Sequence, residues 1–464
     1  MYSGFSHYDR QRFSKVSQVS DPNAAWHNQE PHWGLIEDLI GGTYEVRRRH
    51  RRYLPQEERE QDISYDHRLS RSVVPPYLQR LEKMLAGMLT RKPVRLNDTS
   101  DQIREHLFRV DLLDDLNVWT FETTRKLIRY GHVGVLVDAP TDGNGRPYWV
   151  TYTPRQILGF RHEIIDGEQK LVQLRLSETI TVPDGDWGEK MVEQVRVLTP
   201  GEFKLFQKDE KKGKMEIVDE GTTSLQDIPF SVAYANRVNY MESRPPLEDI
   251  AMLNLKAYQV QSDLDNQLHI SAVPFLIFKG FPSSAEEVSA GPGEAISFPA
   301  EGDAQYIAPP SDAFASQFQR LDQIEKQINE LGLSAVLGQK LSAETAEAKR
   351  LDRSQGDSTM MVIAQNMQDM IDNCLQFHAQ YLSDRQPGSC YVNRDFLGTR
   401  LEPQEIQALL QLYTAGTITQ ETLLSQLSDN EVLGDDFDIE GELEATQAGG
   451  LLEAAPQPED TLIE

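Results

Sequence analysis

The residues best suited to catalysis occur at one place in the sequence, where an apolar run ends in a carboxylate. His132 begins the run, Asp138 ends it, and Asp142 lies four positions beyond. A carboxylate at the end of a buried strand can hold magnesium beside a phosphate, as a metal-dependent hydrolase or nuclease requires. The alternative is a buried strand whose terminal Asp138 caps the following turn. We favour the alternative, because no phosphate-binding loop accompanies the carboxylate.

The other patterns that indicate catalysis or metal binding are missing from the sequence. It contains no Gly-x-x-x-x-Gly-Lys-Ser/Thr loop, no His-Glu-x-x-His helix and no Gly-x-Ser-x-Gly turn. The ten histidines are scattered. The two cysteines, Cys374 and Cys390, have neither metal-knuckle nor disulfide spacing, so we expect reduced thiols. The sequence therefore predicts a protein that is not an enzyme and holds neither a metal nor a cofactor.

The charge of the chain is acidic and unevenly distributed. The 464 residues include 73 Asp and Glu against 46 Lys and Arg, a net charge of -27. This excess disfavours a generic nucleic-acid binder that works through a basic surface. Residues 401–464 hold 15 acids and no base, which leaves -12 for the first 400 residues. The 39% hydrophobic content is typical of a globular protein, and the length predicts about three structural units.

Nothing in the sequence predicts a membrane protein or a secreted one. The longest apolar stretches, 133–139 and 273–278, are far shorter than the ~20 residues that span a bilayer. Residues 1–12 are polar and lack the apolar core of a secretory signal. We expect the protein to be made and kept in cytoplasm-like conditions.

The N-terminal half predicts helices followed by a sheet. Residues 1–30 indicate a loose polar arm, and apolar spacing predicts a short helix over 33–40. Further helices are expected over 65–89, interrupted near Pro75 and Pro76, and over 103–130, before a buried strand at 131–138. Alternating runs separated by glycine turns predict an antiparallel sheet over 148–234.

A run of arginines lies between these early helices. Arg47, Arg48, Arg49, Arg51 and Arg52 flank a histidine. Such a cluster can contact phosphates. We favour a solvated face or a contact with an acidic neighbouring subunit.

The C-terminal half is predominantly helical. One apolar stripe predicts a helix over 247–271, and another predicts a helix over 311–331, with a turn-rich segment and one strand between them. A long polar helix is expected over 342–384, in which Met360, Met361, Met367 and Met370 are packing residues. A small helical pair over 402–427 and a disordered acidic tail complete the chain.

The order of these features resembles that of tailed-bacteriophage portal proteins, in the portal-like family long catalogued as a domain of unknown function. The resemblance covers roughly residues 30–430, and its motifs are specific in their order rather than singly. It is carried by the segments Trp33–Gly42, Tyr53–Pro55, Tyr65–Leu69, Leu85–Pro93, Tyr130–Pro140, Tyr152–Phe160, Pro245–Leu268 and Leu401–Leu427.

The resemblance implies a non-enzymatic α+β, mostly helical portal fold that forms a homododecameric ring. Double-stranded DNA would pass along the ring axis during genome packaging and ejection. The partners would be the terminase large subunit, a head-tail connector or adaptor, and the major capsid and scaffolding proteins, in a virion assembled in the host cytoplasm. The implied parts are a wing (1–246), stem helix 1 (247–271), a clip (272–310), stem helix 2 (311–331), a tunnel loop (332–341), a long wing helix (342–384), a small crown (385–430) and an acidic tail (431–464).

The same resemblance suggests which residues meet DNA and the packaging motor. We expect an acidic stem lining, which would repel phosphates and favour sliding over binding. Its candidates are Asp263, Asp265, Asp322 and Glu325. The candidate channel and tunnel-loop contacts are Arg320, Lys326, Gly338, Gln339 and Lys340, with an inter-subunit salt bridge as the alternative for each cation. Position alone suggests Lys279, Glu286 and Glu287 for terminase docking at the clip, with ordinary solvation as the alternative.

Two other functions compete with the portal ring. One is the metal-dependent hydrolase or nuclease built on the Asp138 region, which lacks convergent His, Asp and Glu motifs. The other is a head-tail adaptor, a class that is usually much shorter and lacks paired stem helices.

Overall fold

The computed structural model divides the chain into two compact units, Met1–Arg394 and Asp395–Glu464. Helices contribute more residues than strands, so the predicted α+β class is confirmed. The described residues are 16, 18–140, 145–209, 213–271, 275–279, 303–307, 312–337, 346–394, 396, 403–429, 432–433, 437 and 439–449.

The first helix is longer than predicted. Helix α1 (Ala24–Gly41) begins where the Asn23 side chain accepts a hydrogen bond from the backbone N–H of Trp26 at 2.9 Å. This N-cap ends the expected polar arm before residue 30. Trp33 and Ile36 of α1 are fully buried. The arginine run then occupies α2 (Thr43–Arg48) and the short 3-10 helix η1 (His50–Arg52).

The next helices confirm one predicted break and add another. The break at Pro75 and Pro76 separates α3 (Asp62–Arg71) from α4 (Tyr77–Leu89). The helix predicted over 103–130 is instead divided into three. Asp111 accepts two backbone hydrogen bonds in a turn, and Asp115 caps the next helix, so local side chains end one helix and start another. The three segments are α5 (Asp101–His106), η2 (Leu107–Arg109) and α6 (Leu116–Tyr130).

The predicted buried strand is the centre of a small antiparallel sheet. Strand β2 (His132–Asp138) lies between β3 (Tyr148–Tyr152) and β9 (Phe230–Tyr234). Gly131 joins α6 to β2 with φ +85°, and a Cβ there would lie 2.7 Å from the Arg244 carbonyl carbon. Only glycine both adopts this positive φ without strain and leaves room for the Arg244 backbone.

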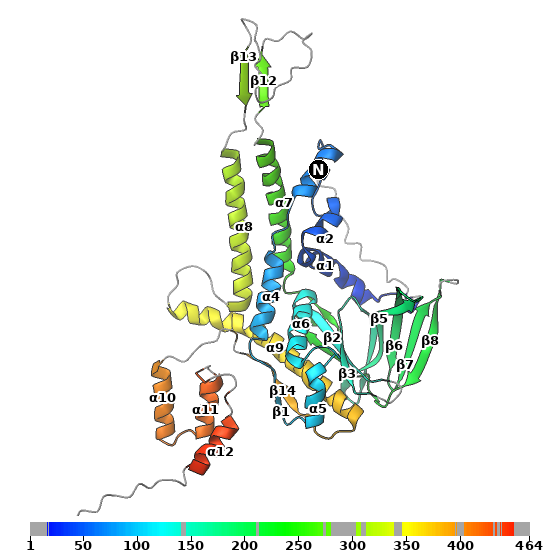
Figure 1. The fold of residues 1–464 in the computed structure, drawn as a ribbon, viewed down its shortest axis with the longest axis vertical. Helices are drawn as coiled ribbons and strands as arrows, with labels where there is room; N and C mark the ends of the chain where they lie inside the picture. Colours follow the sequence, from blue (N-terminus) through cyan, green and yellow to red (C-terminus); the bar gives the residue numbers. More distant parts are fainter. Residues whose placement is uncertain are drawn as a thin grey trace, which may run out of the picture. The chain divides into compact units, whose positions relative to one another are not determined.

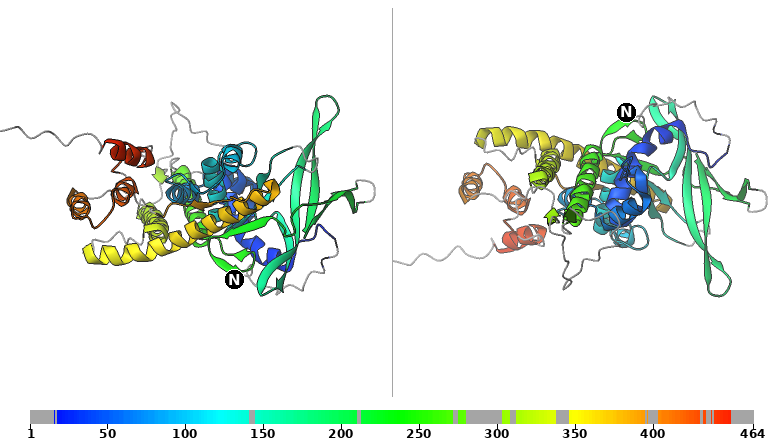
Figure 2. Two further views of the ribbon diagram at one scale, coloured as in Figure 1. Left: turned by 90° about the horizontal axis from the view of Figure 1, so that it is seen from below. Right: turned by 90° about the horizontal axis from the view of Figure 1, so that it is seen from above.

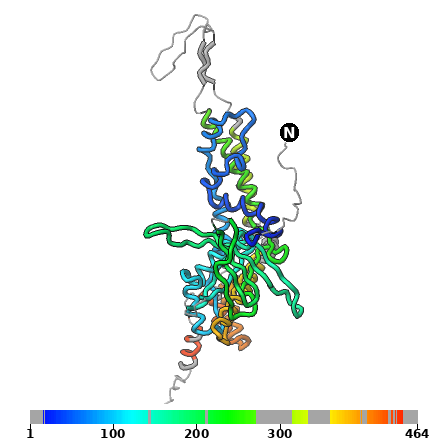
Figure 3. Tube along the Cα trace, turned by 90° about the vertical axis from the view of Figure 1, so that its right-hand side faces the viewer, coloured from blue at the N-terminus to red at the C-terminus, as the bar shows by residue number. Residues whose placement is uncertain are grey.

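A second sheet contains five strands in sequence order, so the region predicted as one sheet forms two. The strands are β4 (Ile157–Ile165), β5 (Glu168–Asp184), β6 (Gly188–Thr199), β7 (Glu202–Lys208) and β8 (Met215–Thr222). Leu174, Leu198 and Phe203 of this sheet pack in a core shared with Leu136 and Phe230 of the first sheet. The turns at the two ends of β5 project to opposite sides of this unit (Figures 2 and 3).

Two long helices follow and confirm the predicted pair. Helix α7 (Glu248–Ser271) and helix α8 (Asp312–Leu337) lie side by side (Figure 1). Between them in the chain, β12 (Phe275–Lys279) pairs antiparallel with β13 (Asp303–Ile307). Helix α8 continues six residues beyond the predicted end at 331, because Gly332 fits against Leu81 without interrupting the helix.

Helix α9 (Ala346–Leu382) is the longest element and runs past the first sheet. Met360, Met367 and Met370 are buried as predicted, whereas Met361 is exposed. The two cysteines are free, as expected, and both are buried. Four further short strands form two antiparallel pairs: β1 (Arg95–Asn97) pairs with β14 (Ser389–Tyr391), and β10 (Arg237–Asn239) pairs with the two-residue β11 (Glu242–Ser243).

The second unit is helical. Helices α10 (Pro403–Thr414) and α11 (Gln420–Asp429) confirm the predicted pair. A third helix, α12 (Ile439–Gly449), lies in the segment predicted to be disordered. The amide of Gln420 donates to Thr446 at 3.2 Å, so α12 is held against α11. Among the described residues, no helix combines the length and apolarity that a membrane span needs.

Candidate functional site

The helix pair α7–α8 is built around one apolar stripe on each helix. Ile324 and Ile328 of α8 are buried, as are Ala257 and Leu264 of α7. These residues recur at helical spacing, which places each stripe on a single face. Any contact that the helix pair makes with another molecule must therefore use the exposed faces of α7 and α8.

The N-terminal helices hold α7 in place through polar contacts. The buried side chain of Asn254 accepts from the backbone N–H of Leu78 at 3.0 Å and donates to the Pro75 carbonyl at 2.9 Å. These two bonds attach the start of α4 to α7. Farther along α7, Tyr258 lies 2.9 Å from the hydroxyl of Ser72.

The predicted charged residues of α8 are all exposed, and two of them lie near another helix. Asp322 and Glu325 act on Tyr77 at the start of α4. Burial raises the pKa of Tyr77, Glu325 and Asp322 raise it further, and Arg80 opposes them. Arg320 and Lys326 are on the same helix. Lys326 lies one turn beyond Asp322, so its charge offsets part of the acidic face.

Of the predicted acids of α7, Asp263 is exposed and Asp265 is half-buried. Asp263 lies 3.5 Å from a guanidinium nitrogen of Arg68 on α3, within its own chain. Burial raises its pKa, and Arg68 lowers it in part. Asp265 is half-buried, and burial raises its pKa as well. Asp263 thus lies near α3, whereas Asp322 and Glu325 act on α4.

Several predicted site residues lie outside the described residues. They are the side chain of Lys279, together with Glu286, Glu287, Gly338, Gln339, Lys340 and Asp142. The predicted tunnel loop 332–341 is helical up to Leu337.

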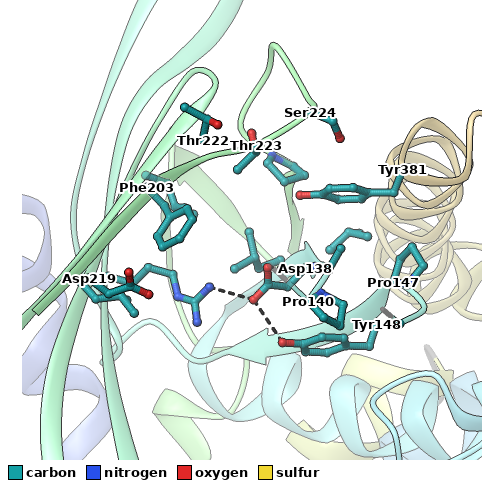
Figure 4. Close-up of a pocket in the computed structure, with 18 of the residues that line it drawn as sticks. Asp138, Pro140, Pro147, Tyr148, Phe203, Asp219, Thr222, Thr223, Ser224 and Tyr381 are labelled. Atoms are coloured by element: carbon teal, nitrogen blue, oxygen red, sulfur yellow. Dashed lines mark hydrogen bonds and ion pairs between the residues drawn. The ribbon is translucent and has the colours of Figure 1, made fainter. Parts of the chain in front are cut away.

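Asp138 does end its strand, and its carboxylate is engaged on several sides. One oxygen accepts from the backbone N–H of Ala139 at 2.9 Å, as the capping interpretation predicts. The other accepts from Arg196 Nη1 at 2.7 Å and from the Tyr148 hydroxyl at 3.3 Å (Figure 4). The three side chains come from β2, β6 and β3.

A second carboxylate shares the same arginine. Glu178 on β5 lies 2.8 Å from Arg196 Nε and also accepts hydrogen bonds from Tyr152 and Gln194. Burial would lower the pKa of Arg196, but Asp138 and Glu178 together raise it above its ordinary value. Burial raises the pKa of Tyr148 to about 12, with Asp138 adding to the effect. Burial and Glu178 raise the pKa of Tyr152 as well. The hydroxyls of Tyr148 and Tyr152 therefore remain neutral and donate hydrogen bonds to the two carboxylates.

This network forms one wall of a cavity of about 480 Å³. Tyr381 from α9 lines the opposite side (Figure 4). Hydroxyls of Thr222, Thr223 and Ser224 also line the cavity. Among the residues that the structure describes, no group of three or more His, Cys, Asp or Glu side chains is arranged to hold a metal ion. The carboxylate that the sequence singled out is held by an arginine, as in a structural ion pair.

His132 is separate from this network. Its ring is buried and stacks on Tyr234 at a centroid distance of 6.1 Å. Its Nδ1 has no hydrogen-bond partner among the described residues. Burial lowers the pKa of His132 to about 3, so the ring is neutral at physiological pH.

Comparison with known proteins gives limited matches. The family model "Domain of unknown function (DUF4055)" matches residues 246–382, which span α7 to α9. No curated protein matches the chain. Solved structures with some likeness include a chain of the neck of an empty gene transfer agent (GTA) particle, with TM-score 0.42, 12% identity, and coverage of 76% of this chain and 90% of that one. A chain of the native GTA virion has TM-score 0.41 and 11% identity over 76% and 90% of the two chains. At such TM-scores the likeness carries no weight, and function is inferred below from the chain's own geometry.

Proposed function

We propose that this chain is a portal subunit of a tailed bacteriophage, a structural protein that forms a ring at the capsid vertex. The observation that carries the proposal is the α7–α8 pair, whose joined apolar stripes leave charged outer faces. The sequence resemblance described above supports the same proposal.

The helix pair also leaves large apolar side chains uncovered. Met252 of α7 is 60% exposed, and Phe318 and Leu331 of α8 are each more than 40% exposed. Exposed apolar residues on a packed helix pair favour contact with another protein surface. A second copy, joined head to tail, would cover them, and such contacts close into a ring when the rotation permits.

In this proposal the ring guides DNA without binding it tightly. Asp322 and Glu325 would repel phosphates, while Arg320 and Lys326 would touch the backbone transiently. The segment between α7 and α8 would dock the terminase large subunit and later the head-tail connector. The ring would be located in the virion and act without a cofactor.

The test is the particle mass of the purified full chain, together with top-view electron microscopy at low and high salt. We expect a ring of about a dozen copies with a central hole, since closed cyclic contacts give one defined size. A chain that remains a monomer or dimer at every salt concentration would refute the portal assignment. A hydrolase would instead show metal-dependent cleavage of DNA that is lost in Asp138→Asn.

A further inference from the structure

The far end of the β5–β6 hairpin is a two-stranded arm that carries an exposed tryptophan. Among the strands that the structure describes, β5 and β6 pair only with each other beyond the Ile157–Leu176 and Gln194–Gln207 pairs, as far as Asp184 and Gly188. Every residue from 183 to 191 is exposed, and Trp187 is 98% exposed. A two-stranded hairpin alone is marginally stable in water, and an exposed Trp is a common anchor of protein interfaces. The arm therefore has the properties of a segment that is ordered by a partner.

The charge of this arm identifies the kind of partner. We define the acidic tip as residues 183–191, in which Asp184, Asp186 and Glu189 outnumber the single Lys190. A cationic surface with an exposed aromatic or apolar component would match both its charge and its tryptophan.

The same chain carries such a surface at α2 and η1. We define the basic patch as the exposed residues Tyr44, Arg48, His50, Arg51 and Arg52. Arg48 pairs with Glu45 and Arg51 with Asp62, both at the surface. Arg52 lies over the ring of Tyr53, at 5.6 Å from its centroid, and among the described residues it pairs with no carboxylate. Tyr44 is 81% exposed and lies one helical turn before Arg48 on α2, so it offers an apolar surface on the same face as that guanidinium group.

Each copy thus has one acidic tip and one basic patch, and the two are not joined within the chain, because Trp187 is almost fully exposed. A tip on one copy and a patch on the next make a head-to-tail contact, the kind that generates rings. The turns at the ends of β5 project sideways from their unit, where a neighbour can be reached (Figure 3).

We propose that the acidic tip of one copy docks on the basic patch of the adjacent copy, with Trp187 packed against Tyr44 and the guanidinium groups. This inference rests in part on the proposed ring, and it adds a specific inter-subunit contact to it. The arginine run then serves assembly rather than DNA binding.

The first experiment reverses charges on each side of the contact and measures assembly of the full chain by mass photometry across a dilution series. Asp184→Lys with Asp186→Lys should raise the concentration for half-assembly at least tenfold, and so should Arg48→Glu with Arg52→Glu. The four substitutions together should restore most of the loss, because the charges are again complementary. Failure of the combined variant to recover, when circular dichroism shows that all variants are folded, would overturn the proposal.

Matched controls exist at the opposite end of β5. Glu163→Lys with Glu168→Lys makes the same charge change on an equally exposed turn, and Ile164→Ala removes an apolar side chain that is 79% exposed. We expect neither to change assembly, whereas Trp187→Ala should weaken it at least tenfold. Equal losses in the control variants would show a general effect of charge or sheet stability, and the proposal would be wrong.

Cross-linking tests the geometry directly. Both native cysteines are buried, so thiols introduced as Asp186→Cys and Arg52→Cys are the accessible ones. The double variant should form inter-chain disulfides in a ladder up to the ring, and neither single variant should. Dimers from Asp186→Cys alone would indicate a symmetric tip-to-tip contact and refute the tip-to-patch contact. If the wild-type chain forms a ring and the charge-reversal variants assemble equally well, only this inference is overturned. If the wild-type chain is a monomer, the proposed function is overturned as well.

Discussion

At the scale of single residues, buried histidines link the stability of this protein to pH. His132 is neutral in the fold because burial lowers its pKa to about 3, and the pKa of His378 on α9 is lowered to about 3 by burial and by its neighbours His106 and Arg146. The Nε2 atom of His378 lies 3.0 Å from Nδ1 of His106, and the Nδ1 atom of His378 accepts a hydrogen bond from Nε1 of Trp149 at 3.3 Å. In the unfolded chain a histidine has a pKa of about 6.5. Acid therefore protonates the unfolded state first, and stability falls as pH drops below about 6.5.

His132→Phe tests this linkage. The substitution keeps an aromatic ring against Tyr234 and removes the group that titrates only on unfolding. Between pH 6.5 and 5 the variant should lose about 1.6 kcal/mol less unfolding free energy than the wild type, because the slope reaches its full value of about 1.4 kcal/mol per pH unit only well below the unfolded pKa. Urea unfolding at both pH values measures the difference. Parallel losses in the two proteins would show that His132 is protonated in the fold.

The sequence correctly predicted that Asp138 caps a turn. It did not predict the ion pairs that join Asp138, Arg196 and Glu178. Arg196 and Glu178 are 58 and 40 positions away in the sequence. Arg196 reaches Asp138, and Glu178 shares that arginine, because the two sheets share a core and the register between strands is set by that packing. No spacing rule along the chain reveals such a meeting.

At the scale of elements, the helix pair depends on a polar attachment rather than on its stripes alone. Asn254 of α7 satisfies two backbone groups at the start of α4. Asn254→Ala should lower the unfolding free energy by about 2–3 kcal/mol, because the buried N–H of Leu78 and the partly buried carbonyl of Pro75 would both lose their partner. Asn366→Ala is the matched control, since that amide donates to the Val362 carbonyl of its own helix α9 in an exposed hydrogen bond. Urea unfolding that shows equal losses for both variants would contradict the attachment.

Elements with a strong apolar period were predicted well, and those shaped by local side chains were not. The apolar stripe predicted a helix over 247–271, and α7 spans Glu248–Ser271, so the bounds agree to within one residue. The turn between η2 and α6 was missed, because two aspartates accept backbone hydrogen bonds inside a sequence of helical periodicity. Helix α12 was missed because an acidic composition favours disorder until a neighbouring helix covers one face.

At the scale of the whole molecule, the acid excess suits a conduit. Of the net charge of -27, a share of -15 belongs to residues 401–464, and the remainder is distributed over the residues that form the sheets and the helix pair. In the proposed ring, long-range repulsion from such a body would keep a DNA duplex from settling on it. Cations at particular places would then decide where the duplex touches the ring, and the arginine run would contribute to assembly.

The segment after α8 provides the final prediction. Deletion of 338–341 removes Gly338, Gln339 and Lys340 and leaves the Gly332–Leu81 contact in place. We expect the ring to form normally, because that contact and the α7–α8 stripes are intact, while DNA packaging or retention falls in a complementation assay. Deletion of 332–337 is the contrasting variant, and it should lower the unfolding free energy by shortening α8 at its contact with α4. If removal of 338–341 abolished the ring, the segment would be part of the subunit interface and its role at the channel would be refuted.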